Sequence, residues 1–216
     1  EILDITTRDY AVMCVEPNAG ALDDFIDHTE TTILPIKDAC LVISDKLSVP
    51  IHPMIGVIGT APADQAVLNG TPGEHGGNMD CKLITASATV HLPVNVPGAM
   101  LALGDLHAVM ADGEMCICGA EVSGEVTLKA TASRSQISTP CVETDSHYHL
   151  IGSAKSLDEC EQVVLAKGHT FLTQTHGMTA NQAARAMSLL CDLAVCQVVD
   201  PLKTMRLSIP KMLVVG

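Results

Sequence analysis

The sequence predicts a mainly β fold that carries a helical hairpin near its C-terminal end. Up to about residue 155, short Val- and Ile-rich runs alternate with Gly, Pro, Asn and Asp, as in strands joined by turns. Apolar residues then take helical spacing, and strand character returns after residue 193. We therefore expect one domain over residues 1–216, with a β-rich part (1–155), a helical hairpin (156–193) and closing strands (194–216).

Several individual strands are expected within this plan. They are residues 11–15, 41–43, 89–93, 100–103 and 125–130, followed after the helices by 194–199 and 205–209. Within 125–130, Val126, Leu128 and Ala130 alternate with polar residues. Such alternation is typical of a strand with one buried face.

The helical hairpin has its own start and stop signals. Ser156 with Glu159, and Thr179 with Gln182, have the spacing of capping boxes, in which each side chain bonds the other residue's backbone N–H. Gly177 is expected to end the first helix in a left-handed conformation. The surface of the hairpin is acidic and neutral, so we expect it to pack against the domain and not to bind DNA.

The composition of the 216 residues narrows the possible partners. Hydrophobic residues make up 47% and aromatic residues 2%, which predicts a large core of aliphatic side chains. The net charge of −13 repels nucleic acid and tolerates neutral substrates. No apolar run reaches the roughly 18 residues of a membrane helix, so no membrane partner is expected.

The cysteines and the first residues bear on location. Nine cysteines, an odd number, lie mostly in apolar runs, which predicts small buried hydrophobes in a reducing cytoplasm and no disulfide framework. Residues 1–5 lack the basic and apolar regions of a signal peptide. They read as the middle of a strand without an initial Met, so we expect a further N-terminal segment to precede them.

The first candidate site is the glycine-rich stretch of residues 72–80. It carries His75, Asn78 and Asp80 among three glycines, and glycine permits backbone conformations that bring such side chains together. A tight, solvated surface turn is the alternative interpretation.

The second candidate site covers residues 104–114. Asp105 and His107 are two apart and share a face of a strand, as do Asp112 and Glu114. A chain reversal near residues 111–113 would bring the two pairs together at one sheet edge. Three carboxylates and an imidazole suit a divalent metal, and a carboxylate can act as general base. A hairpin with solvated charges is the alternative.

Two further polar stretches are weaker candidates. Residues 141–149 alternate Glu143, Asp145, His147 and His149, which fits either a polar edge strand or a site with a proton carrier. Asp200 and its neighbours are expected to be structural. The sequence has no P-loop and no Gly-x-Ser-x-Gly elbow.

Several stretches together resemble the acetamidase/formamidase family in order and spacing. They are PMIGVIGTAP (53–62), GEHGGNMD (73–80), LPVNVPGA (92–99), GDLH (104–107), DGE (112–114), VET (142–144), LCDL (190–193) and CQVVDP (196–201). The resemblance covers nearly the whole chain.

The resemblance implies a β/β/α-type fold and hydrolysis of formamide, acetamide or similar small amides. It also implies a divalent metal, zinc or alternatively calcium, and a homo-oligomer, for which we expect a dimer. The expected metal ligands are His75, Asp80, Asp105 and His107; the expected catalytic residues are Glu114 and, in reserve, Glu143; Asn78 and Asp112 are expected to bind substrate.

Two other functions remain open at this point. A non-catalytic or truncated paralogue would bind the metal without turnover. A cysteine-nucleophile amidase would use a thiol, with Cys81 beside the glycine-rich stretch as the candidate.

Overall fold

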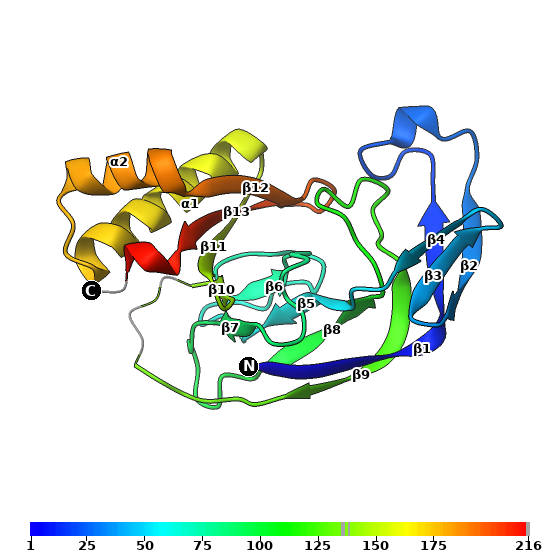
Figure 1. Cartoon of the computed structure of the whole chain (residues 1–216), viewed down its shortest axis with the longest axis horizontal. Coiled ribbons are helices and arrows are strands. Elements are labelled where there is room, and N and C mark those ends of the chain that lie inside the picture. Colours follow the sequence, from blue (N-terminus) through cyan, green and yellow to red (C-terminus); the bar gives the residue numbers. More distant parts are fainter. Residues whose placement is uncertain (135–136, 138, 215–216) are drawn as a thin grey trace.

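The fold has three layers, two β-sheets and a pair of helices (Figure 1). A computed structural model describes residues 1–134, 137 and 139–214. The predicted mainly β fold with a C-terminal helical hairpin is confirmed, and its layers follow the expected β/β/α order. Among the described residues, no helix is both long enough and apolar enough to cross a membrane.

The larger sheet has eight strands within the described residues. They are β1 (Ile2–Val15), β2 (Glu30–Lys37), β3 (Cys40–Ser44), β4 (Leu47–Pro50), β5 (Met54–Gly59), β6 (Gly76–Asn78), β8 (Ala102–His107) and β9 (Glu121–Leu128). Their order across the sheet is β4-β3-β2-β1-β9-β8-β5-β6. The expected strand at 100–103 begins two residues later than predicted and runs on to His107.

The smaller sheet has five strands in the part of the chain that the structure describes. They are β7 (Thr89–His91), β10 (Cys141–Glu143), β11 (His147–Ala154), β12 (Asp192–Gln197) and β13 (Lys203–Pro210), in the order β12-β13-β11-β10-β7. The antiparallel pair β12–β13 closes through a turn at residues 198–202. Residues 215–216 of the predicted closing strands lie outside the described residues.

The helices cover the smaller sheet on the side away from the larger one (Figure 1). They are α1 (Leu157–Thr170), extended by a π turn (Phe171–Thr175), and α2 (Ala180–Leu190); 3-10 turns lie at Asp23–Phe25 and Lys211–Leu213. The Thr179–Gln182 capping box and the left-handed Gly177, with φ of 67°, are confirmed. Ser156 caps α1 as expected, but the Glu159 carboxylate accepts from the Lys155 N–H and not from Ser156.

Two apolar cores separate the layers, and the smaller sheet contributes to both. Val142 and Ile151 face the core between the sheets, whereas Cys141 and Leu150 face the helices. Adjacent strand residues point to opposite faces, so a continuous apolar run in β10 and β11 serves both sides. The sheet is therefore buried on both faces, which makes it a rigid support for the residues in its turns.

Phe171 is expected to be a main support of the helical layer. Its ring is 2% exposed and packs edge-on against Tyr148 and His176. Replacement of Phe171 by Ala removes this packing and leaves a cavity, so we expect a loss of about 3–5 kcal/mol in the free energy of unfolding, measured by urea denaturation. Phe25, which is 82% exposed, is the matched control, and Phe25→Ala should change stability by less than about 0.5 kcal/mol.

Candidate active site

His107 lies at the centre of the candidate site, at the end of β8. It is fully buried and lies between Met54 of β5 and Glu121 of β9 in the sheet. Gly119 packs on the ring, and a Cβ at that position would lie 2.7 Å from the ring Cγ. The backbone around the imidazole therefore holds it in one orientation.

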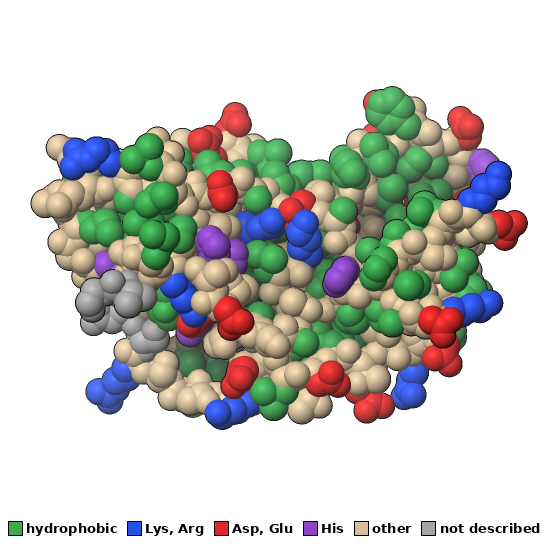
Figure 2. Space-filling view, viewed as in Figure 1, with side chains coloured by type: hydrophobic (Ala, Val, Ile, Leu, Met, Phe, Trp, Pro, Cys, Tyr) green, Lys and Arg blue, Asp and Glu red, His purple; other side chains and the backbone are tan. Residues whose placement is uncertain are grey.

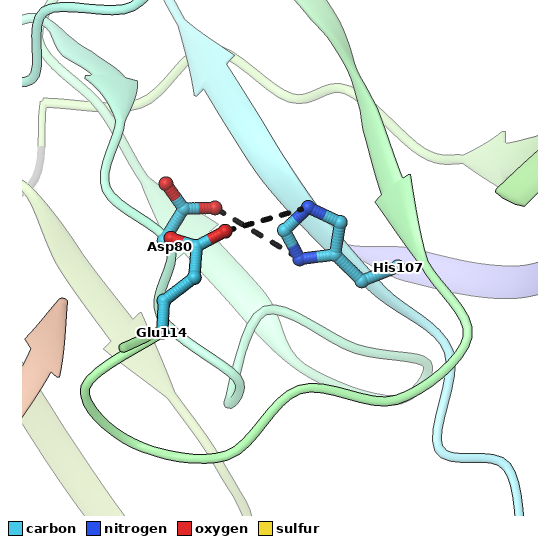
Figure 3. Close-up of side chains that lie close together, drawn as sticks. All are labelled: Asp80, His107 and Glu114. Atoms are coloured by element: carbon cyan, nitrogen blue, oxygen red, sulfur yellow. Dashed lines mark ion pairs between the residues drawn. The ribbon is translucent and has the colours of Figure 1, made fainter. Parts of the chain in front are cut away.

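Asp80 and Glu114 converge on this imidazole from two loops (Figure 3). Asp80 Oδ1 lies 4.0 Å from His107 Nδ1, and Glu114 Oε1 lies 3.9 Å from His107 Nε2. Asp80 is 1% exposed and Glu114 is 7% exposed. The three side chains each offer a ligand atom within 4.8 Å of the others, so they form a group that can hold a metal ion.

A second group shares His107 and lies nearer to solvent. His107 Nε2 is 3.0 Å from Glu121 Oε1 and 3.6 Å from Asp105 Oδ1, and the side chains of Glu121 and Asp105 are about one third exposed. Asp105 has a positive φ of 59°, so β8 leaves the regular pleat there. The site thus has a buried side and an open rim.

The buried side lacks hydrogen-bond partners. Within the described residues, neither Asp80 oxygen makes a hydrogen bond and neither does His107 Nδ1, while His107 Nε2 has only its ion-pair contact with Glu121. Buried polar atoms normally have partners, because leaving them unpaired costs free energy. Gly56 adds space beside them, since a Cβ there would lie 2.5 Å from Asp80 Oδ1 and 2.3 Å from Asp105 Oδ2.

These features fit a divalent cation. Carboxylate oxygens and an imidazole nitrogen are ligands for zinc, and carboxylates alone also suit calcium. A cation among Asp80, His107 and Glu114 would satisfy the unpartnered atoms and neutralise the crowded carboxylates. These ligand types admit either metal.

The pKa values of the group reflect burial first and the crowding of like charges second. Burial, and then the Glu114 charge, raise the pKa of Asp80 to about 9. Burial raises the pKa of Glu114 to about 7 against the effect of His107. For His107, burial lowers the pKa, but Asp105 and Glu121 outweigh it and raise the pKa to about 10. Without a cation, Asp80 and His107 are therefore both protonated near neutral pH, which reduces the repulsion among the carboxylates.

The stability of the cation-free protein is therefore expected to fall as pH rises. Between pH 5 and 9, folded Asp80, Glu114 and His107 hold more protons than in the unfolded chain, where their pKa values are about 3.9, 4.3 and 6.5. Stability decreases with pH wherever the folded state binds more protons. We expect the Tm in chelator to fall by roughly 5 °C or more between pH 5 and pH 9. Saturating Zn²⁺ should largely remove this fall, and a Tm that rises with pH would contradict the assignment.

Not every residue predicted from the sequence reaches this group. His75 belongs to neither group among the described residues; its ring packs on Gly77 and lines a separate cavity of about 150 Å³ with Val57 and Met100. Glu143 lies in the smaller sheet, where Lys211 Nζ and His91 Nε2 bond its two oxygens at 2.6 and 2.8 Å. The roles proposed for these two residues stay predictions.

The two residues predicted to bind substrate are placed differently. Asp112 is bonded on both oxygens by Arg206 at 2.8 Å, and Lys82 lies 2.9 Å away. Residues 112–114 form a loop and not the expected strand. Asn78 Oδ1 is buried without a partner among the described residues, beside Asp200.

Sequence reasoning missed Glu121 and gave Asp200 only a structural role. Asp200 lies in the β12–β13 turn and interacts with Asp80 and Glu114. Burial raises its pKa to about 6. The CQVVDP stretch was part of the resemblance, and a buried carboxylate after an apolar strand was the available signal. No local pattern marked Glu121.

Comparisons with known proteins agree with this fold. The Acetamidase/Formamidase family pattern matches residues 63–193. An acetamidase of Bacillus halodurans has a solved structure that is 44% identical, with a TM-score of 0.96 over 98% of this chain and 72% of that one. A predicted acetamidase/formamidase of Thermoanaerobacter tengcongensis is 36% identical, with a TM-score of 0.92 over 98% of this chain and 71% of that one.

A curated relative covers less of the chain. The acetamidase of Mycolicibacterium smegmatis is 35% identical over 122 residues, which are 50% of this chain and 30% of that protein. The chain thus spans less than a third of this relative in the matched segment. The family pattern, the shared fold and the identity to solved acetamidases agree, and the chain belongs to the acetamidase/formamidase family.

Proposed function

We propose that the protein hydrolyses short aliphatic amides such as formamide and acetamide to a carboxylate and ammonia, with a divalent cation at Asp80 and His107. The observation that carries this proposal is the buried group of Asp80, His107 and Glu114, in which both Asp80 oxygens and His107 Nδ1 lack hydrogen-bond partners within the described residues. Its membership of a family named for this chemistry supplies the substrate class.

The ligands and the proton carrier have separate roles in the proposal. Asp80, His107 and Asp105 hold the cation, with zinc preferred over calcium because of the imidazole. When bound, such a cation supplies Lewis-acid chemistry by polarising a carbonyl oxygen and making water more acidic. His75 is not included, because its ring faces another cavity.

Glu114 moves the protons in this proposal. Its Oε1 takes a proton from the attacking water and delivers it to the amide nitrogen, because a neutral amine leaves more readily than an amide anion. Glu114 is placed for both steps, because its Oε1 lies 3.9 Å from His107 Nε2 beside the proposed cation and a positioned carboxylate can act as acid and base. Glu143 is the reserve candidate, but both of its oxygens are engaged by Lys211 and His91.

The proposal also covers the charge of the substrate, the location and oligomeric state of the protein, and the role of Cys81. A neutral substrate suits a chain with a net charge of −13. We also propose a cytoplasmic homodimer. Cys81 is a poor nucleophile candidate because its side chain is fully buried, even though a hydrogen bond with the free thiol of Cys196 lowers its pKa.

Ammonia release tests the function directly. The protein is incubated with formamide or acetamide, first with Zn²⁺ and then after treatment with chelator. We expect ammonia only with the cation, and restored release when Zn²⁺ is added back. Equal release after complete metal removal would remove the cation from the mechanism. Tight Zn²⁺ binding without ammonia would favour the non-catalytic paralogue.

A further inference from the structure

The two loops that carry Asp80 and Glu114 meet at one partly exposed ion pair. Asp112 lies two residues before Glu114, and Lys82 lies two residues after Asp80. Lys82 Nζ is 2.9 Å from Asp112 Oδ2. Asp112 therefore joins both loops at a point just outside the candidate site.

Arg206 of β13 anchors this junction to the smaller sheet. Its guanidinium, 8% exposed, donates from Nη1 and Nη2 to the two oxygens of Asp112, both at 2.8 Å. Nη1 also donates to the Val195 carbonyl at 3.0 Å. A bidentate pair fixes the orientation of a carboxylate as well as its position, because the guanidinium is a planar fork.

Backbone bonds hold the same loop against β12. The Gly113 N–H donates to the Cys196 carbonyl at 2.8 Å, and the Val198 N–H donates to the Gly113 carbonyl at 3.1 Å. Gly113 has a φ of 106°, and Glu114 has a φ of 47°, which is unfavourable for a residue with a side chain. An unfavourable conformation persists only where its surroundings impose it.

We propose that Arg206 is a positioning residue that, through Asp112, sets the Glu114 carboxylate against His107 and Asp80. The proposal rests on the proposed function only for the role of Glu114 in turnover. It differs from a purely structural anchor in one respect: loss of Arg206 should disturb the 112–114 loop and the cation site more than it disturbs the rest of the fold.

The variants Arg206→Met, Arg206→Lys and Asp112→Asn test this proposal. Arg206→Lys keeps the positive charge but loses the planar guanidinium, and Asp112→Asn keeps the size of the side chain. These two variants keep the series informative if Arg206→Met does not fold. Lys167→Met is the matched control. Lys167 is also largely buried on α1, with Nζ bonded to the Thr139 and Ile151 carbonyls and paired with the exposed Glu74 at 2.9 Å, and none of these partners lies in residues 79–82 or 112–114.

Hydrogen exchange and Zn²⁺ affinity are the two readouts. We expect Arg206→Met and Asp112→Asn to raise amide exchange at Gly113 and Val198 about tenfold or more. Zn²⁺ binding, measured by calorimetry, should weaken about 10–100-fold, because Asp112 also holds Lys82 in the loop that carries the proposed ligand Asp80. Arg206→Lys should be intermediate. Lys167→Met should leave both readouts unchanged, even where it lowers the Tm.

The outcomes of these experiments distinguish a failure of the positioning role from a failure of the proposed function. Wild-type exchange at Gly113 and Val198 in folded Arg206 and Asp112 variants would overturn it, as would equal changes in Lys167→Met. If the wild-type protein releases no ammonia or binds no Zn²⁺, the function fails, and exchange alone decides the positioning role. If it does release ammonia, Arg206→Lys should cost little further turnover in a Glu114→Gln background, because residues that act through each other are not additive.

Discussion

Glu114→Gln is expected to lower the turnover of formamide by about 10²–10⁴-fold, the range that a positioned proton carrier contributes. Gln keeps the size of the side chain and cannot take up a proton. Zn²⁺ affinity should stay within a few-fold of the wild-type value, because the proposal gives the cation to Asp80, His107 and Asp105. Ammonia release and Zn²⁺ calorimetry on the same preparations measure the two quantities.

A surface glutamate provides the matched control for Glu114. Glu125→Gln changes a surface carboxylate whose partner is the exposed Arg8, and it should leave both quantities unchanged. Unchanged turnover in Glu114→Gln would remove Glu114 as the proton carrier. Loss of Zn²⁺ together with turnover would make Glu114 a ligand, which its place in the group with Asp80 and His107 allows.

Asp80→Asn is expected to have opposite effects on the two states of the protein. At pH 8 in chelator, the variant should unfold at a higher temperature than the wild type, because a buried carboxyl with a raised pKa destabilises the folded state above its unfolded pKa. With Zn²⁺ the order should reverse, since the variant lacks a ligand charge and gains little from the cation. Thermal unfolding in chelator and in Zn²⁺ measures both effects.

A surface aspartate provides the comparison for Asp80. Asp64 is exposed, and Asp64→Asn should change neither melting temperature by more than about 1–2 °C. A lower melting temperature of Asp80→Asn in chelator would show that the carboxyl is stabilising as it stands. An undiminished shift with Zn²⁺ would remove Asp80 from the ligand set.

The parts of the fold with local signals could be predicted from the sequence. The alternation in residues 125–130 marked β9, and the capping residues Thr179 and Gln182 marked the start of α2. The order of strands across the sheets had no such signal, because it depends on contacts between distant segments. β1, for example, pairs with both β2 and β9.

The candidate site likewise contains residues that a local sequence pattern predicts and residues that depend on contacts between distant segments. Asp105 and His107 were predicted to lie together because two residues on one strand share a face, and the structure brings their side chains within 3.6 Å. The strand spacing assumed for Asp112 and Glu114 was wrong, since positive φ angles at Gly113 and Glu114 make a loop. That loop sends Asp112 to Arg206 and Glu114 to His107. Asp200 arrives from the other sheet, which no local pattern indicates.

Both sheets contribute residues to the candidate site, so the order in which the sheets form determines when the site is complete. Asp80 and His107 belong to the larger sheet and its loops, whereas Asp200 and the anchor of the Glu114 loop come from the β12–β13 ribbon near the end of the chain. Contacts between segments so distant in sequence carry a large loop-closure entropy and form slowly during folding. Under the proposed function, a chain in which only the larger sheet has formed would hold Asp80 and His107 but would lack the anchor of the Glu114 loop, so the site would be complete only once the β12–β13 ribbon has packed.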